Sequence, residues 1–107
     1  MSHQRIQMGT TKDGYLLPGA DFQVSKAVRA GDLVFLTGAA GLTIDGNYFL
    51  GSGAPAAQAD NALGVVSTLL EEAGASLDNI CKVTTYVTDR SHRNEVYPVL
   101  ARHLAGV

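Results

Sequence analysis

Apolar and polar residues alternate loosely between Phe22 and Val28, a pattern that predicts a β-strand. Ala30-Gly31-Asp32 has the composition of a turn, and Leu33 to Thr37 then predicts the second strand of a hairpin. Four apolar residues, Leu33 to Leu36, follow one another without a polar break. Because successive side chains of a strand point to opposite faces, this strand carries apolar groups on both of its faces.

A helix is predicted from Ala56 to Ala73, a segment rich in Ala and Leu. Pro55 suits its first turn, and Gly74 suits the position just after its end. The apolar residues that share one face are Leu63, Val66, Leu70 and Ala73, with Ala59 and Ala62 beside them. This is the pattern of an amphipathic helix that packs on a sheet.

A second helix is predicted over residues 95–105, with Val96, Leu100 and Leu104 spaced as a core stripe. Pro98 predicts that the regular part begins near or after that residue, and Gly106 is a candidate C-terminal cap. Between the two helices, residues 81–88 give the clearest strand pattern of the chain. One face would carry Cys81, Val83, Thr85 and Val87, and the other Lys82, Thr84, Tyr86 and Thr88. Cys81 would then be a buried and inert cysteine.

Shorter signals complete the pattern. Arg5 to Met8 predicts a short edge strand, Asp45-Gly46 a turn, and Tyr48 to Leu50 a short irregular strand. The main elements follow the order strand, strand, helix, strand, helix. We therefore predict a single α+β domain with both helices on one face of the sheet. The apolar residues on the other face of the second strand need a cover, and another copy of the chain would supply it.

Composition and charge narrow the function classes. The chain has 107 residues, 46% hydrophobic and 17% charged, which fits one small globular domain. The net charge is -2 and the basic residues form no stripe, so a nucleic-acid partner is disfavoured. A single cysteine excludes an intrachain disulfide, and the three histidines have no ligand spacing, so we expect no metal site. Without an apolar leader or a membrane-length apolar run, we expect a cytoplasmic protein with no membrane partner.

Four sequence segments, in order, resemble the YjgF/Rid family of reactive intermediate deaminases. They are the hairpin "VSKAVRAGDLVFLTG", the "AQ" that opens the first helix, the passage "EAGASLDNICKVTTYVTD", and "NEVY" after it. The resemblance covers residues 22–104. It implies a chorismate-mutase-like fold, with two helices on one face of the sheet, and a homotrimer whose sheets form a central barrel. Many members hydrolyse reactive enamines and imines to 2-keto acids and ammonia in clefts between subunits, without cofactor or metal.

The resemblance also suggests site residues. A 2-imino acid carries a carboxylate, which is best held by a fixed cation, and an electrophilic carbon that needs oriented polar groups and a proton carrier. Thr37 and Gly38 match the Ser/Thr-Gly that lines the family's cleft at the end of the hairpin strand. Val24, however, precedes Ser25 where active deaminases have a tyrosine. The family's carboxylate-binding arginine, and a glutamate after it, would lie beyond Val107. The domain, residues 1–107, is thus expected to lack the family's last strand or strands, and its catalytic residues stay unidentified.

Other residues have both a functional and an ordinary interpretation. Arg90 and Arg93 could bind an acidic ligand in place of the family arginine, or be solvated loop residues. Tyr86 could line a cleft between subunits or pack in the oligomer, and His103 has the place of a helix-end histidine. Three functions remain open: an imine deaminase, a non-catalytic trimeric protein that binds a small carboxylate ligand, and an endoribonuclease, which the acidic balance disfavours.

Overall fold

The hairpin predicted from the sequence is the centre of the sheet. The computed structural model describes residues 3–6, 9–11, 22–41 and 53–107. In it, β4 (Ala27–Ala30) pairs antiparallel with β5 (Leu33–Leu36), with Ala27 opposite Leu36 and Ala30 opposite Leu33. Gly31 opens the two-residue turn at φ 60°, and two-residue hairpin turns require a positive φ at this position. The hairpin prediction is confirmed.

Shorter strands extend this hairpin. β1 (Gln4–Ile6) pairs antiparallel with β4, so the sheet has the order β1-β4-β5. β1 corresponds to the edge strand predicted near Arg5. β2 (Gly9–Thr11) and β3 (Phe22–Val24) form a separate two-stranded sheet. The predicted first strand is therefore two strands, because the backbone bends at Lys26. The turn at Asp45-Gly46 and the strand at Tyr48 to Leu50 fall outside the described residues.

The helix α1 (Pro55–Glu72) covers one face of the sheet. It begins at a proline, and Gly74 follows its end at φ 82°. The amide of Gly74 donates to the carbonyl of Glu71, and that of Ala75 to the carbonyl of Leu70. This is the Schellman arrangement, in which a glycine at positive φ lets two carbonyls of the last turn find donors. The predicted bounds of the helix and its glycine end are confirmed.

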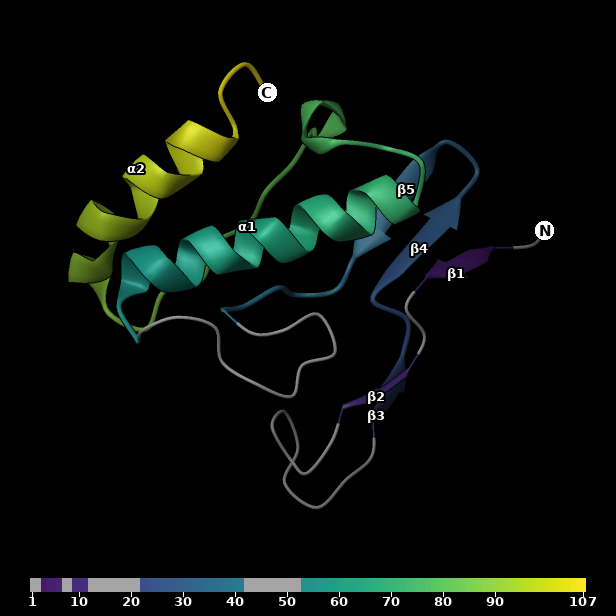
Figure 1. Ribbon diagram of the computed structural model, residues 1–107, viewed down its shortest axis with the longest axis horizontal. Helices are drawn as coiled ribbons and strands as arrows, with labels where there is room; N and C mark the ends of the chain where they lie inside the picture. The colour runs from purple at the N-terminus through teal and green to yellow at the C-terminus, as the bar shows by residue number, and fades with distance from the viewer. Residues whose placement is uncertain (1–2, 7–8, 12–21, 42–52) are drawn as a thin grey trace.

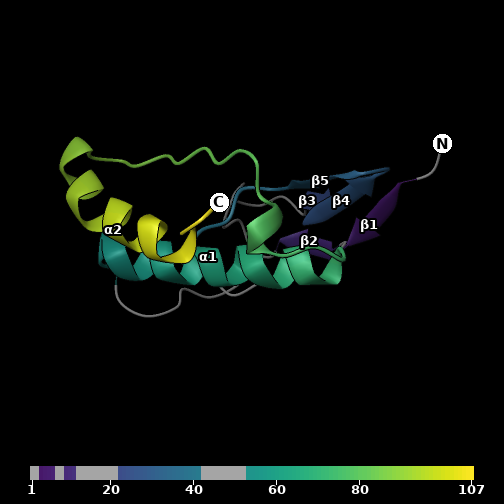
Figure 2. The same cartoon turned by 90° about the horizontal axis from the view of Figure 1, so that it is seen from above.

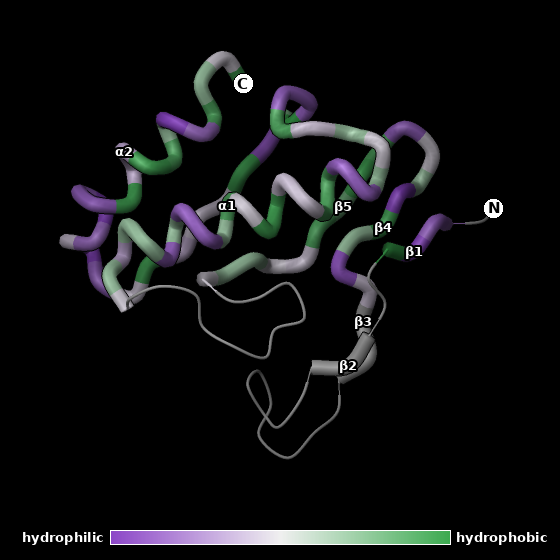
Figure 3. The backbone as a smooth tube through the Cα atoms, in the orientation of Figure 1, coloured by the Kyte–Doolittle hydropathy of each residue, from purple (hydrophilic) through white to green (hydrophobic). Residues whose placement is uncertain are grey.

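The core lies between α1 and the sheet. It consists of Ile6, Ala27, Leu69 and Ala73, with Val34, Leu36 and Val65 packed against them. Leu69 is 1% exposed, although the predicted apolar stripe of α1 did not include it. The reason is that α1 contacts both the sheet and the second helix, so it buries two faces where an amphipathic stripe accounts for one. Figure 3 shows the corresponding hydrophobic residues in β5 and along α1.

Arg29 ties the hairpin to the end of α1. Its Nη1 donates to the carbonyl oxygen of Ala73 at 2.7 Å, and its Nε to that of Gly31 at 3.3 Å. The Ala73 carbonyl belongs to the last turn of the helix, where carbonyls lack helical partners and carry the negative end of the helix dipole. A cation from β4 thus completes the helix end.

The second helix, α2 (Arg93–His103), begins earlier than predicted and contains Pro98. It follows directly on the 3-10 helix η2 (Arg90–His92), so the chain is already helical before the proline. Val96 and Val99 are its buried residues, and Leu100 and Leu104 are half-buried. Gly106 has φ 83°, as expected for a glycine after a helix end. The helix is therefore confirmed, but its predicted start is wrong.

The strand predicted over residues 81–88 is not formed. The segment is extended, and all of its residues are exposed. Cys81 is an exposed free cysteine, so the prediction of a buried one is wrong as well. No hydrogen bond joins the segment to another residue of the described chain. A period-two pattern can prepare a segment for a sheet, but a strand also needs a neighbour with which to pair.

The molecule has two layers (Figures 1 and 2). Both helices lie in one layer, with α2 beside α1. In Figure 2, the strands β4 and β5 and the extended segment that follows the 3-10 helix η1 (Leu77–Asn79) lie in the other layer. No described residue covers the outer face of β5, where Leu33 is 57% exposed and Phe35 59%. In residues 3–6, 9–11, 22–41 and 53–107, no helix is both long and apolar enough to cross a membrane.

Candidate functional site

Thr37 and Gly38 lie where β5 ends. The backbone amide of Thr37 donates to the carbonyl of Lys26 at 2.9 Å, and its Oγ1 donates to the same oxygen at 3.3 Å. The hairpin therefore fixes the threonine side chain, while the lone pairs of its oxygen can still accept a hydrogen bond. Gly38 is exposed, and a Cβ placed on it would meet nothing within 4 Å. A ligand could approach the backbone at this point.

The chain beyond Gly38 is held against the start of α1. Gly41 is buried, and a Cβ on it would come within 2.9 Å of the Cα of Gln58. Only a glycine permits this approach without a shift of the helix. Gln58 in turn donates from Nε2 to the carbonyl of Gly53, just before the helix. The Thr37–Gly38 turn is thus fixed on one side by the hairpin and on the other by α1.

The other predicted ligand-binding residues lie elsewhere. Val24 is the last residue of β3, opposite Gly9, and its part in a site stays a prediction. Tyr86, in the extended segment, is 91% exposed. Arg90 begins η2, and Arg93 begins α2. The Nε of Arg93 donates to the carbonyl of Arg90 at 3.2 Å, and no other pair of predicted site residues is joined by a hydrogen bond or ion pair in the described chain.

Asp89 shapes the loop that carries these arginines. Its Oδ1 accepts from the amide of Ser91 at 2.8 Å and from the Ser91 hydroxyl at 2.7 Å. These two hydrogen bonds lower the pKa of Asp89 from its ordinary value of 3.8. The carboxylate acts as the N-cap of η2 and sets the course of the chain into α2.

The described chain does not join all of these residues into a single site by hydrogen bonds or ion pairs. β5 packs on the C-terminal half of α1, through Val34, Leu36 and Leu69. The start of α2 lies near the other end of α1 (Figure 1). In the described chain, no hydrogen bond or ion pair joins Thr37 or Gly38 to either arginine.

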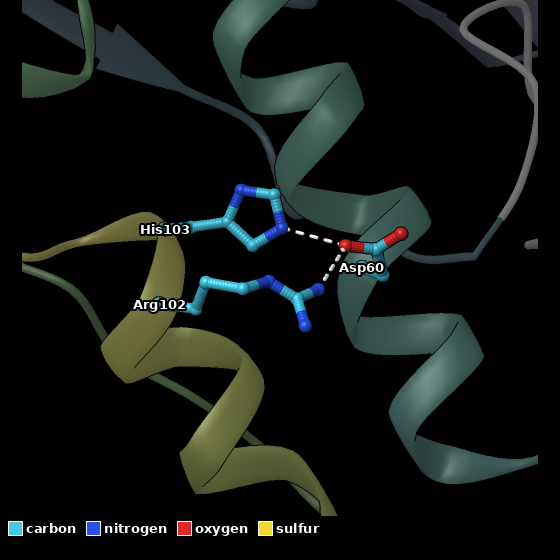
Figure 4. Close-up of polar contacts among 3 residues, drawn as sticks. All are labelled: Asp60, Arg102 and His103. Atoms are coloured by element: carbon cyan, nitrogen blue, oxygen red, sulfur yellow. Dashed lines mark hydrogen bonds and ion pairs between the residues drawn. The ribbon is translucent and has the colours of Figure 1, made fainter.

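The structure also shows a polar cluster that the sequence did not reveal. Oδ1 of Asp60 in α1 lies 2.8 Å from Nη2 of Arg102 and 2.6 Å from Nε2 of His103, at the end of α2 (Figure 4). The hydrogen bond from His103, and then that from Arg102, lowers the pKa of Asp60 from its ordinary value of 3.8. More than forty positions separate these partners in sequence, so no local pattern could pair them. His103 is indeed at a helix end, but its partner is a carboxylate.

This cluster joins α1 to α2. Its geometry indicates no catalytic or ligand-binding role. Asp60 and Arg102 are exposed, with relative side-chain accessibilities of 50% and 66%. Exposed ion pairs contribute little to stability because water and salt screen them. Among the described residues, no three His, Cys, Asp or Glu side chains are grouped to hold a metal ion.

Comparisons with known proteins agree with the fold. The sequence profile of the family described as Endoribonuclease L-PSP matches residues 17–107. Two proteins of Saccharomyces cerevisiae are similar: Protein MMF1, mitochondrial, is 32% identical over 88 residues, and Protein HMF1 is 30% identical over 86 residues. These alignments cover 82% and 80% of this chain, but they span 59% and 65% of the length of the two relatives.

A solved structure gives the same relationship. The chain superposes with a TM-score of 0.68 and 31% identity on Rv2704 of Mycobacterium tuberculosis, a member of the YjgF/YER057c/UK114 family. The match covers 95% of this chain and 74% of that one. Profile, relatives and structure agree, and the chain belongs to the Endoribonuclease L-PSP family, also known as the YjgF/UK114 family.

Proposed function

We propose that the chain is a Rid-type deaminase that hydrolyses reactive 2-imino and enamino acids to 2-keto acids and ammonia, without metal or cofactor. The observation that carries this proposal is the Thr37–Gly38 pair, which lies beside open space at the end of β5 in a chain of this family. It is the position at which the family lines its clefts. Residues 1–107 would act as one domain of this kind.

The reaction needs few groups. Water adds to the imine carbon, the C–N bond then breaks, and ammonia leaves with the proton that the nitrogen has taken up. The Thr37 oxygen and the exposed backbone at Gly38 would orient the substrate. A guanidinium would hold its carboxylate, and Arg90 and Arg93 are the candidates in this role. Tyr86 would add a hydroxyl at the same cleft.

The cleft would form between copies of the chain. The uncovered apolar side chains of Leu33 and Phe35 give a physical reason for association, because burial of apolar surface is the main favourable term in assembly. A trimer in which the sheets face one another would cover them. It could also bring Thr37 of one copy toward the arginines of the next. The cytoplasmic location suggested by the N-terminal sequence stays a prediction.

The test is the loss of freshly generated 2-iminopropionate, followed with the purified chain and with buffer alone. We expect acceleration by the chain, and a slower reaction after Thr37→Val, which removes the hydroxyl at similar size. Thr84→Val is the matched control, since Thr84 lies in the exposed extended segment. If the folded chain gave no acceleration, this proposal would be wrong for residues 1–107.

A second function has one observation in its favour. The hydroxyl hydrogen of Thr37 is directed to the Lys26 carbonyl, and no acidic or basic side chain is bonded to this threonine in the described chain. With Val24 in place of a tyrosine, the same site would then bind a small carboxylate ligand without turnover. Calorimetry with pyruvate separates the two: binding without hydrolysis of 2-iminopropionate would favour the binding protein.

RNA cleavage, which the family description names, is the weakest candidate. The net charge of -2 gives no long-range attraction for a polyanion. A salt-sensitive association with single-stranded RNA in a binding assay would revive it.

A further inference from the structure

We infer that Lys26 is a ligand-binding residue of the Thr37–Gly38 site, where its ammonium group holds the carboxylate of a small 2-imino or 2-oxo acid. This inference deepens the proposed function, and it rests on that function only in placing the ligand at Thr37 and Gly38. It applies equally to hydrolysis of the ligand and to binding without turnover. The local sequence around Lys26 predicts no more than a strand residue, so its role follows from the structure.

Lys26 lies opposite Thr37 across the hairpin. The register that pairs Ala27 with Leu36 reaches this pair one step further along. The Lys26 carbonyl accepts a hydrogen bond from the amide of Thr37 at 2.9 Å and another from its Oγ1 at 3.3 Å. Opposite residues of an antiparallel pair have Cβ atoms about 4.5–5.5 Å apart. A ligand that contacts the Thr37 side chain is therefore within reach of the flexible four-carbon stem of the lysine.

The backbone of Lys26 is fixed from two sides. Its amide donates to the carbonyl of Ile6 in β1 at 3.0 Å, and its carbonyl holds Thr37 at the end of β5. None of these hydrogen bonds uses the lysine side chain. The ammonium group can therefore turn to a ligand while the Cα keeps its place, which reduces the entropy that binding must overcome.

The charge of Lys26 is open to an anion. The residue is half-buried, and no described residue forms an ion pair or a side-chain hydrogen bond with its ammonium group. Attraction between opposite charges is stronger where water is partly excluded. Arg29, the other cation of this hairpin, is instead bonded to the carbonyls of Ala73 and Gly31. Lys26 is thus the hairpin cation that an anionic ligand can use.

These groups define the chemistry of the ligand. A carboxylate accepts hydrogen bonds from the ammonium group of Lys26. The hydroxyl of Thr37 gives its hydrogen to the Lys26 carbonyl, so toward a ligand its oxygen can only accept, as it would from the N–H of an imine. Open space at Gly38 leaves room for the carbon between these two groups. The arrangement suits a 2-imino acid better than a neutral imine.

The experiment compares the affinities of the intact chain for pyruvate and for pyruvamide, in which a neutral amide replaces the carboxylate. Calorimetric titration should show tighter binding of pyruvate. Lys26→Met should weaken pyruvate binding about tenfold to hundredfold, as expected for loss of a hydrogen bond to a charged group. It should change the affinity for pyruvamide by less than about threefold. Lys26→Arg keeps the charge and should restore most of the preference for pyruvate.

Lys82→Met is the matched control, because it makes the same substitution at an exposed lysine in residues 81–88. It should leave both affinities unchanged. The substitutions at Lys26 spare the hydrogen bonds of its backbone, and an amide NMR spectrum of each variant verifies the fold. Three results would overturn the inference: an equal loss for pyruvate and pyruvamide, a loss no larger than that of Lys82→Met, or no binding of pyruvate by the unaltered chain.

Hydrolysis of 2-iminopropionate by the same samples separates this inference from the proposed activity. If the unaltered chain accelerates hydrolysis and Lys26→Met has the same KM, the deaminase proposal stands and the role of Lys26 is wrong. If the chain binds pyruvate through Lys26 and gives no acceleration, the role of Lys26 stands and the deaminase proposal is wrong.

Discussion

Two segments of this chain have sequences typical of β-strands, but only one of them is paired in the described chain. The β4–β5 hairpin is paired, and its inner side chains pack on α1. Residues 81–88 have the cleaner alternation and more β-branched residues, yet they are exposed and unpaired in the described chain. The difference lies in what surrounds each segment. The hairpin contains its own partner, two residues away across a turn, whereas residues 81–88 have no such neighbour nearby in sequence.

The comparison shows that β-propensity reports how well side chains fit a pleated surface, and not whether such a surface is present. Stability in this molecule should therefore be concentrated where β4, β5 and α1 meet. It should be low along residues 81–88. The predictions below test that contrast, from the largest expected effect to the smallest.

Truncation of a core side chain should lower the free energy of unfolding most. Leu69→Ala removes a side chain that is 1% exposed at the contact of α1 with the sheet, and it should lower the free energy of unfolding by about 2–5 kcal/mol. Val83→Ala in the extended segment, where Val83 is 46% exposed, should change it by less than about 0.5 kcal/mol. Urea unfolding of both variants makes the comparison. Similar losses would mean that residues 81–88 share the core.

Loss of the hydrogen bond from Arg29 of β4 to the end of α1 should have the next largest effect on stability. Arg29→Met keeps the aliphatic part of the side chain but leaves the Ala73 carbonyl without its charged donor. We expect a loss of ~1.5–3 kcal/mol in urea unfolding. Arg29→Lys, which can still donate, should lose less. If methionine and lysine were equivalent, the hydrogen bond would contribute nothing measurable.

Two glycines should respond to alanine in opposite directions. Gly31 has φ 60° in the hairpin turn, and a Cβ disfavours this conformation. Gly31→Ala should therefore lower the free energy of unfolding by about 1–2 kcal/mol. Gly64 lies inside α1, and a Cβ on it would meet nothing within 4 Å. Gly64→Ala should therefore stabilise by about 0.5–1 kcal/mol. Thermal unfolding would show both shifts, and a stabilised Gly31→Ala would contradict the assigned turn.

The smallest effect should come from the exposed cluster of Asp60, Arg102 and His103. The pKa of Asp60 is lowered in the folded state, first by the hydrogen bond from His103 and then by that from Arg102. Its contribution is therefore present above the ordinary pKa of 3.8, and it is lost as the pH falls through the lower folded value. Asp60→Asn should be slightly less stable than the unchanged chain at neutral pH, and this difference should vanish in acid. An unchanged difference at low pH would exclude this origin.

The sequence predicted those elements whose determinants are local. The turn at Gly31, the helix start at Pro55 and the helix end at Gly74 depend on backbone preferences that single residues carry. The apolar residues of β5 also indicated the exposed face of this strand, which no described residue covers. These parts of the fold could be read without a structure.

The parts that sequence missed depend on distant partners. Residues 81–88 have no strand to pair with among the described residues, and Cys81 is exposed for the same reason. Leu69 is buried because α1 has two neighbours, and Asp60 meets its partners from another helix. The start of α2 depends on the preceding turn at η2, which Asp89 caps. Of the candidate site, only the fixed Thr37–Gly38 segment follows from local pattern, since no hydrogen bond or ion pair joins Arg90 or Arg93 to it in the described chain.

Amide hydrogen exchange, followed residue by residue by NMR on the purified chain, tests the central contrast most directly. The amides of Phe35 and Thr37, which bond across the hairpin, should exchange slowly. Those of residues 81–88 should exchange at nearly the rate of an unfolded chain. Slow exchange along residues 81–88 would show that the segment is already paired, and it would contradict the contrast drawn between it and the hairpin.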